Sequence, residues 1–201
     1  MDNTYLLTQN TYRIILQSMC HPGKIYQLSG GKIYGQSSAD AQIDSGEVDG
    51  LMSVFLTLLD HEVTFFLLAN GANSIEAKIF ELTRSTVSNI ESADFIIIPD
   101  GKSGGELLKA KRGSLDYPDD GATVMYLIDS LRDSSNEKNH ILLKGPGIKD
   151  RLEISVSGQL KDEFLCIKEA NAEFPLGIDS IFIDKSDRIM CIPRSTMIEE
   201  N

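Results

Sequence analysis

The segment "PDGKSGGE" at residues 99–106 has the glycines and the lysine of a loop that could bind an anion. It follows an apolar run and opens a helical one, which is where a phosphate-binding loop lies. That motif requires a glycine at position 96, where this chain has Ile96, and the loop is too short to wrap a phosphate. The segment therefore predicts a tight turn with Ser103 near a helix N-cap. A weaker anion site at that helix N-terminus is the alternative.

The histidines and acidic turns do not have the spacing of a metal site. His21, His61 and His140 lie far apart, and Cys20 is adjacent to His21 instead of one helical turn away. The segment "DYPDDG" at residues 116–121 lacks the alternating carboxylates of a calcium loop. We therefore expect no bound metal, and a solvated turn at this segment.

Asp60, His61 and Glu62 form an acidic–histidine grouping between an expected helix and an expected strand. A carboxylate–histidine couple can act as a general acid and base, but sequence neighbours usually point apart. The alternative is a helix C-terminus, at which a histidine interacts favourably with the last carbonyls.

The segment at residues 171–196 predicts a β-hairpin. Pro175 fixes the direction of the chain before it, Gly177 permits a turn, and Pro193 ends the second strand. Asp179 and Arg194 fall at the two ends of the hairpin. They predict a structural ion pair, or an arginine that is free to meet an anionic group of a partner.

Apolar residues on both faces of the first hairpin strand predict an interior strand. One face would carry Ile178, Ser180, Phe182 and Asp184, and the other Asp179, Ile181 and Ile183.

The remaining periodicities alternate between helix and strand. They predict helices at 8–19, 51–60, 73–84, 104–111 and 159–170, and strands at 62–68, 94–98, 122–128 and 140–145. The first helix would bury Tyr12, Ile15, Leu16 and Met19, and residues 29–50 would form a long loop or an irregular hairpin. "GPGI", with Gly145 and Gly147, predicts a turn. The fold class expected is α/β, a three-layer mixed sheet covered by helices.

The composition indicates one domain over residues 1–201. The net charge of −11 argues against general binding to nucleic acid or acidic membranes. Three widely spaced cysteines predict reduced thiols in a cytoplasm. The longest apolar runs are far too short to span a membrane, and the N-terminus lacks the features of a signal peptide.

Several blocks of the sequence, read in order, resemble the PhnH family, a component of the bacterial phosphonate carbon–phosphorus lyase system. They are "YRIILQSMCHPGKI", "LTLLDHEVTFFL", "GATVMYLIDSL", "LLKGPGI" and "FPLGIDSIFI" with the trailing "IMCIPRST". The family usually has an aromatic–His–Thr run near residues 80–86, where this chain has "FELTRST". Thr83 matches the threonine of that run, and the histidine is replaced.

The resemblance implies a shortened pyridoxal-phosphate transferase fold that has lost its cofactor. It implies a homodimer, and a core complex with subunits like PhnG, PhnI and PhnJ. That complex forms α-D-ribose 1-alkylphosphonate 5-triphosphate from ATP and an alkylphosphonate, with release of adenine. This chain would be a required accessory subunit of such a transferase complex, without a cofactor. Its candidate interface or ligand-cleft residues are Asp60, Thr83, Arg84, Asp179 and Arg194.

A free-standing transferase or nucleotide-binding enzyme with the same cleft is the alternative. Absorbance near the pyridoxal band, or activity without partners, would favour it.

Overall fold

A computed structural model describes residues 3–29, 47–69, 73–131, 140–156 and 158–200. The helices are α1 (Asn3–Cys20), α2 (Glu47–Leu58), α3 (Asn73–Thr83) and α4 (Gly158–Ala170), with 3₁₀ turns η1 (Glu106–Lys109) and η2 (Pro118–Asp120). The strands are β1 (Tyr26–Gln27), β2 (Thr64–Leu67), β3 (Thr86–Val87), β4 (Phe95–Ile98), β5 (Thr123–Ile128), β6 (His140–Lys144), β7 (Leu152–Ser155), β8 (Asp179–Asp184), β9 (Arg188–Ile192) and β10 (Met197–Glu200). The predicted loop at 29–50 lies mostly outside the described residues, and it is wrong for residues 47–50, which form the start of α2.

The central sheet has seven strands in the order β1-β9-β8-β5-β4-β2-β3. Its middle is parallel, since β5 pairs in parallel with both β4 and β8, and β2 with both β4 and β3. The β8–β9 hairpin and β1 add antiparallel strands at one side. A second, antiparallel sheet has the order β10-β6-β7. The predicted mixed α/β architecture is confirmed.

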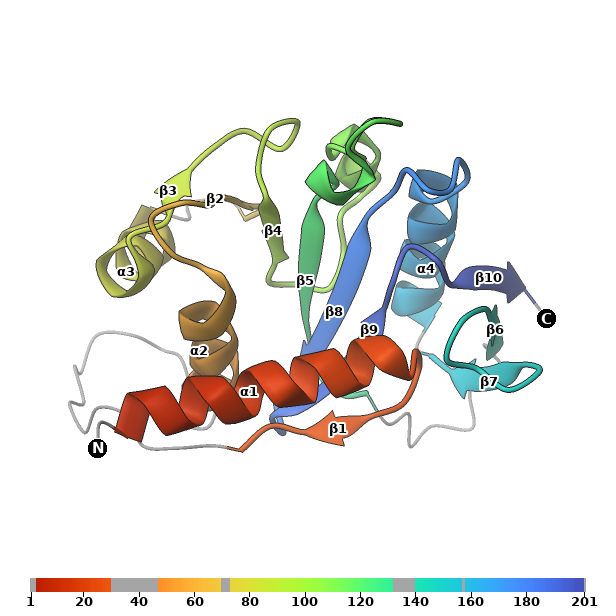
Figure 1. Cartoon of the computed structure of the whole chain (residues 1–201), viewed down its shortest axis with the longest axis horizontal. Helices are drawn as coiled ribbons and strands as arrows, with labels where there is room; N and C mark the ends of the chain where they lie inside the picture. Colours follow the sequence, from red (N-terminus) through yellow and green to blue (C-terminus); the bar gives the residue numbers. More distant parts are fainter. Residues whose placement is uncertain (1–2, 30–46, 70–72, 132–139, 157, 201) are drawn as a thin grey trace.

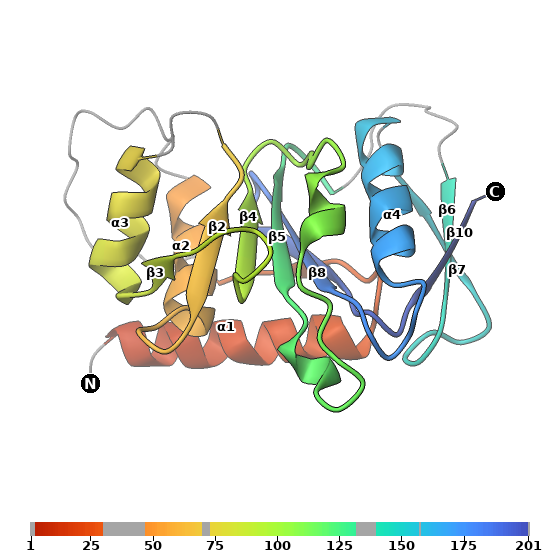
Figure 2. The ribbon, with the colours of Figure 1, turned by 90° about the horizontal axis from the view of Figure 1, so that it is seen from above.

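Helices cover both faces of the central sheet (Figures 1 and 2). One core lies under α1 and α2 and contains Phe55, Ile97 and Ile181. The other core lies under α4, η1 and the small sheet, and contains Phe164 and Phe182. Because neighbours in β8 point to opposite cores, the prediction of an interior strand is confirmed.

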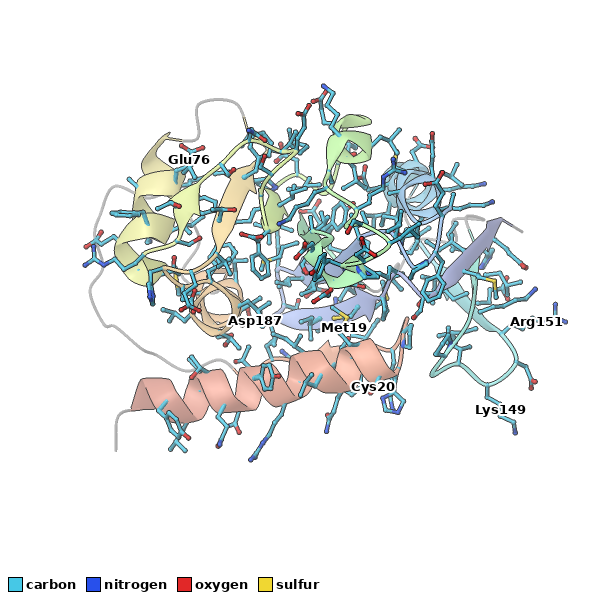
Figure 3. The ribbon with its side chains drawn as sticks, turned by 45° about the horizontal axis from the view of Figure 1, so that its top comes forward. Met19, Cys20, Glu76, Lys149, Arg151 and Asp187 are labelled. Atoms are coloured by element: carbon cyan, nitrogen blue, oxygen red, sulfur yellow. The ribbon has the colours of Figure 1, made fainter. Side chains whose placement is uncertain are left out.

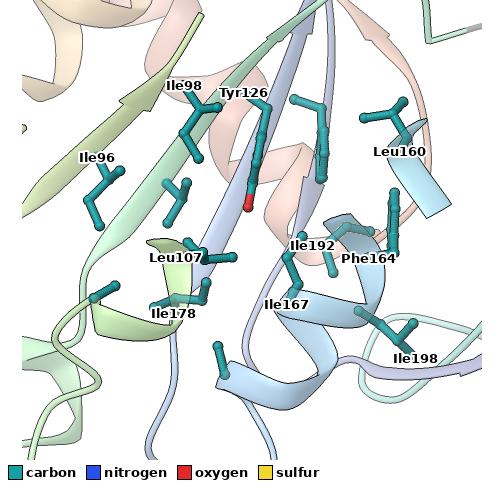
Figure 4. Close-up of a cluster of buried hydrophobic side chains, with 14 of the residues drawn as sticks. Ile96, Ile98, Leu107, Tyr126, Leu160, Phe164, Ile167, Ile178, Ile192 and Ile198 are labelled. Carbon is teal, nitrogen blue, oxygen red and sulfur yellow. The ribbon is translucent and has the colours of Figure 1, made fainter. Parts of the chain in front are cut away.

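A stack of aromatic rings lies at the centre of the second core (Figure 4). The ring of Phe182 in β8 lies 4.6 Å from Tyr126 in β5 and 5.2 Å from Phe164 in α4, measured between centroids. Such pairs contribute about 1 kcal/mol each beyond the burial of area. The stack therefore fixes α4 over the middle of the sheet.

The predicted buried face of the first helix is partly wrong. α1 buries Leu7, Thr11, Ile15 and Ser18. Tyr12 and Leu16 are 50% and 45% exposed on its outer side. The small Thr11 and Ser18 side chains share the face of Ile15 at helical spacing, and they allow the helix to lie close to β9.

The two-residue strands β1 and β3, and the edge strands β7 and β10, were not predicted. β7 alternates apolar and polar residues but has only four of them, and β10 follows the proline that ends the hairpin. The helix predicted at 104–111 is only the 3₁₀ turn η1, whose N-cap is Gly105 in a left-handed conformation. Among the described residues, no helix is long and apolar enough to cross a membrane.

Candidate functional site

The predicted ion pair between Asp179 and Arg194 is formed at the amino edge of the parallel strands. Asp179 is the first residue of β8, and Arg194 follows the end of β9. Nη2 and Nε of Arg194 donate to Oδ2 of Asp179 at 2.6 and 3.1 Å, and its backbone N–H donates to Oδ1 at 2.8 Å. The two side chains are 14% and 25% exposed, Arg194 first. The charge of Arg194 is therefore compensated inside the protein.

The same guanidinium also holds the segment that enters β5. Nη1 donates to the carbonyl of Pro118 in η2, and Nη2 donates to the carbonyl of Gly121 at 3.3 Å. The Arg194 side chain thus donates four hydrogen bonds, and all four acceptors belong to the protein. Arg194 is a positioning residue for this edge, and the alternative of an arginine free for an anion does not fit this geometry.

A shallow, open depression of about 340 Å³ lies beside this ion pair. It is lined by Pro118, Asp119, Phe174, Pro175, Asp179 and Arg194. The lining comes from the η2 loop, from the loop after α4 and from the ends of the hairpin. Two of the predicted candidates therefore meet at one surface site.

The loop after α4 is fixed by hydrogen bonds around Gly177. Its N–H donates to the carbonyl of Arg112 at 2.9 Å, and the side chain of Asn171 exchanges hydrogen bonds with Ile178 at 2.7 and 3.2 Å. Gly177 has φ 151°, and a Cβ built there would lie 2.4 Å from Oδ1 of Asn171. The prediction that this position needs glycine agrees with that geometry. The bond between Phe174 and Pro175 is cis.

The other three predicted candidates lie away from the depression. Thr83 is buried and donates to the carbonyl of Ile79 at 2.8 Å, which closes the C-terminus of α3. Arg84 follows with φ 64°, and its guanidinium lies 5.8 Å from the ring of Phe80. Asp60 is exposed and accepts from the N–H of Glu62 at 2.8 Å. In these contacts all three residues stabilise local turns.

The predicted turn at Gly145 and Gly147 is formed between β6 and β7. The N–H of Ile148 donates to the carbonyl of Gly145 at 3.1 Å. Gly147 has φ 82°, and a Cβ there would lie 2.2 Å from the carbonyl oxygen of Cys20. Cys20 at the end of α1 and Lys149 on this loop lie at the same end of the molecule (Figure 3). Pro193 directly follows β9, as predicted.

The loop at residues 99–106 is a tight turn built on a buried carboxylate. The N–H of Ser103 donates to Oε2 of Glu163 in α4 at 2.9 Å, and the hydroxyl of Tyr126 donates to Oε1 at 3.0 Å. Ser103 Oγ accepts from the N–H of Gly105 at 3.3 Å, so it supports the turn without capping η1. Burial, followed by the charge of Glu163, raises the pKa of Tyr126 well above its ordinary value. Sequence reasoning missed Glu163, because it looks like an ordinary acidic residue on an amphipathic helix.

A second buried carboxylate, that of Asp184, lies at the carboxyl end of β8. Asp184 accepts from Nη2 of Arg188 at 2.6 Å and from the N–H of Leu131 and Ser186, each at 2.9 Å. Burial by itself would raise the pKa of Asp184, but these hydrogen bonds outweigh it and lower that pKa. The hydrogen bonds join the hairpin turn to the segment that leaves β5.

Histidine, cysteine, aspartate and glutamate side chains do not gather in groups of three that could hold a metal ion, within the described ranges. The depression beside Arg194 offers a partner hydrogen bonds, charge and apolar contact.

The fold and this site define a mixed α/β protein with a partly apolar depression at the amino edge of its central sheet. A family model described as bacterial phosphonate metabolism protein (PhnH) matches residues 1–199. The chain therefore belongs to the PhnH family, as the sequence blocks predict. The putative C-P lyase subunit protein HtxG of Stutzerimonas stutzeri is 27% identical over 192 residues, which cover 94% of this chain and 85% of that protein.

Proposed function

We propose that this chain is a subunit of a carbon–phosphorus lyase complex, and that it assembles with subunits like PhnG, PhnI and PhnJ. The observation that carries the proposal is the family match over residues 1–199. The similarity to HtxG, named as a putative subunit of such a system, supports it. The depression at the amino edge supports a binding role, because it is an open, partly apolar surface. Arg194 holds the loops around it in place through its hydrogen bonds.

Within that complex the chain would be required for the first stage, which forms α-D-ribose 1-alkylphosphonate 5-triphosphate from ATP and an alkylphosphonate and releases adenine. We expect it to act as an accessory subunit without its own cofactor. Deleting its gene in the source bacterium should abolish growth on methylphosphonate as the phosphorus source and leave growth on inorganic phosphate unchanged. Extracts should also lose the triphosphate intermediate. Equal growth on both sources would contradict this function.

The fold would be a shortened pyridoxal-phosphate transferase fold without the cofactor. The mostly parallel sheet covered by helices on both faces is compatible with that relationship. A ligand that binds the folded state raises the melting temperature by mass action. We expect pyridoxal phosphate to leave the melting temperature unchanged, and a rise of several degrees would contradict the proposed loss of the cofactor.

We also propose a homodimer in isolation. The hairpin that suggested it lies inside the sheet, since β8 is flanked by β5 and β9. The outer face of α1 now supports it, because Tyr5, Leu6, Tyr12 and Leu16 are 45–65% exposed there. A second copy would cover this stripe. Sedimentation showing only a 22.2 kDa species at micromolar concentration would contradict the dimer.

The three cysteines are free thiols, which supports the proposed location in a reducing cytoplasm. Fractionation of cells into cytoplasm and periplasm tests it, and recovery in the periplasm would contradict it.

A further inference from the structure

Large apolar side chains are exposed on both loops that border the depression. Leu115 and Tyr117, just before η2, are 78% and 64% exposed, and Phe174 after α4 is 64% exposed. Pro118 and Pro175 line the depression between them. Figure 2 shows these two loops at the same edge of the central sheet. We call residues 112–121 and 171–178 together the edge surface.

Hydrogen bonds within this chain hold the two loops of the edge surface together. Arg194 links η2 to the hairpin, and the N–H of Gly177 donates to the carbonyl of Arg112 at 2.9 Å, which joins the two loops. Within the first loop, the N–H of Ser114 donates to the carbonyl of Tyr117 at 3.0 Å. A preorganised apolar surface loses little conformational freedom on binding, so its exposed rings are suited to anchoring a partner.

The charge around the apolar residues is mostly negative. The edge surface exposes the carboxylates of Asp116, Asp119, Asp120 and Glu173, and the guanidinium of Arg112. Asp179 and Arg194 compensate each other. A partner segment that places an apolar side chain in the depression would therefore be favoured by flanking lysines or arginines, and disfavoured by flanking carboxylates.

We infer that the edge surface is a docking site for a protein segment with an apolar anchor flanked by basic residues. The anchor would occupy the depression between Pro118 and Phe174, and the basic residues would face Asp119, Asp120 and Glu173. The partner's chemistry follows from this surface alone. Assigning it to another carbon–phosphorus lyase subunit rests on the proposed function.

Fluorescently labelled peptides of sequence KKLFKK, EELFEE and KKSSKK test the inference directly by anisotropy with the full chain. At low salt, where charge is least screened, KKLFKK should bind about tenfold more tightly than either control peptide. Phe174→Ser and Asp119→Lys should each weaken its binding about tenfold. Phe80→Ser removes an exposed ring on α3, outside both the edge surface and the α1 stripe, and should have no effect. Melting curves confirm that each variant is folded. Equal binding of the three peptides, or an equal loss in Phe80→Ser and Phe174→Ser, would overturn the inference.

Co-expression with the PhnG-, PhnI- and PhnJ-like subunits separates this inference from the proposed function. Phe174→Ser should reduce the co-purified fraction, whereas Phe80→Ser should not. If the wild-type chain shows the peptide preference but co-purifies with none of these subunits, the docking site stands and the proposed function fails. If the wild type co-purifies and shows no peptide preference, the proposed function stands and the docking site fails.

Discussion

Asp179 binds Arg194 across the open ends of the β8–β9 hairpin through two donors of the guanidinium and the backbone N–H, at 2.6, 3.1 and 2.8 Å. The same arginine reaches the carbonyls of Pro118 and Gly121 on the neighbouring segment. One side chain thus connects the two strand ends with the loop that enters β5. The stability of this edge of the sheet should therefore depend on Arg194.

Arg194→Ala should destabilise the fold by about 3 kcal/mol, because it leaves the partly buried Asp179 carboxylate without its guanidinium and two carbonyls without a donor. This expectation differs from the one that an exposed arginine would give, which is an unchanged fold. Arg194→Lys restores the charge but not the planar fork, and should recover less than half of the loss. Urea unfolding measures all three proteins. An alanine variant as stable as the wild type would show that the ion pair adds nothing.

Gly177→Ala should be more destabilising than Gly104→Ala. Both glycines have positive φ, 151° and 60°, so both substitutions introduce backbone strain of about 1 kcal/mol. A Cβ at Gly104 meets nothing within 4 Å, whereas at Gly177 it would lie 2.4 Å from Asn171 Oδ1. We expect about 2 kcal/mol of additional loss from that overlap. Equal losses of unfolding free energy in urea would mean that backbone strain alone explains both changes.

The stability that Asp184 contributes should depend on pH. Its pKa in the folded state lies below the value of 3.8 for the free side chain. Its contribution is therefore fully present above the unfolded pKa and is lost as the pH falls from about 5 through the folded pKa. At neutral pH, Asp184→Asn should cost about 2 kcal/mol, and the difference from wild type should shrink in acid. Asp129→Asn, at a side chain that is 90% exposed, is the matched control and should have little effect. A difference that stays constant down to about pH 3 would contradict the lowered pKa.

The three thiols should react with alkylating agents at different rates. Cys20 is exposed, whereas burial raises the pKa of Cys166 and brings that of Cys191 to about 12. Since the thiolate is the reactive form, iodoacetamide at about pH 8 should modify Cys20 first and Cys166 slowly. Cys191 should react only in denaturant. Mass spectrometry after timed quenching measures the order, and Cys20→Ser should remove the fast phase. Early modification of Cys191 would mean that the α1–β9 contact opens readily.

The central strands were predictable because β-branched runs are unambiguous. Ile96, Ile97 and Ile98 in β4, and Ile181 and Ile183 in β8, are fully or nearly fully buried. The outer helices were less predictable, because the face that a helix buries depends on the surface against which it packs. The apolar pattern of α1 allowed Tyr12 and Leu16 as buried residues, but the sheet surface instead accepts the smaller Thr11 and Ser18.

The site was predictable only where residues adjacent in space also mark the ends of one hairpin. Asp179 and Arg194 meet that condition, since the strands that separate them are antiparallel. The contact of Arg194 with Pro118 crosses 76 residues, and that of Ser103 with Glu163 crosses 60, so no local pattern encodes either. Leu115, Tyr117 and Phe174 were missed for a related reason, because a loop sequence does not tell whether an apolar side chain stays exposed.

Assembly with the other subunits is the most direct test of the central claim that this chain is a carbon–phosphorus lyase subunit. The full chain, tagged and co-expressed with the PhnG-, PhnI- and PhnJ-like proteins of the same bacterium, should elute with them from a size-exclusion column as one complex. Subunit ratios should stay constant across the peak. Elution of this chain apart from a complex formed by the other three, at any protein concentration in the micromolar range, would contradict the account.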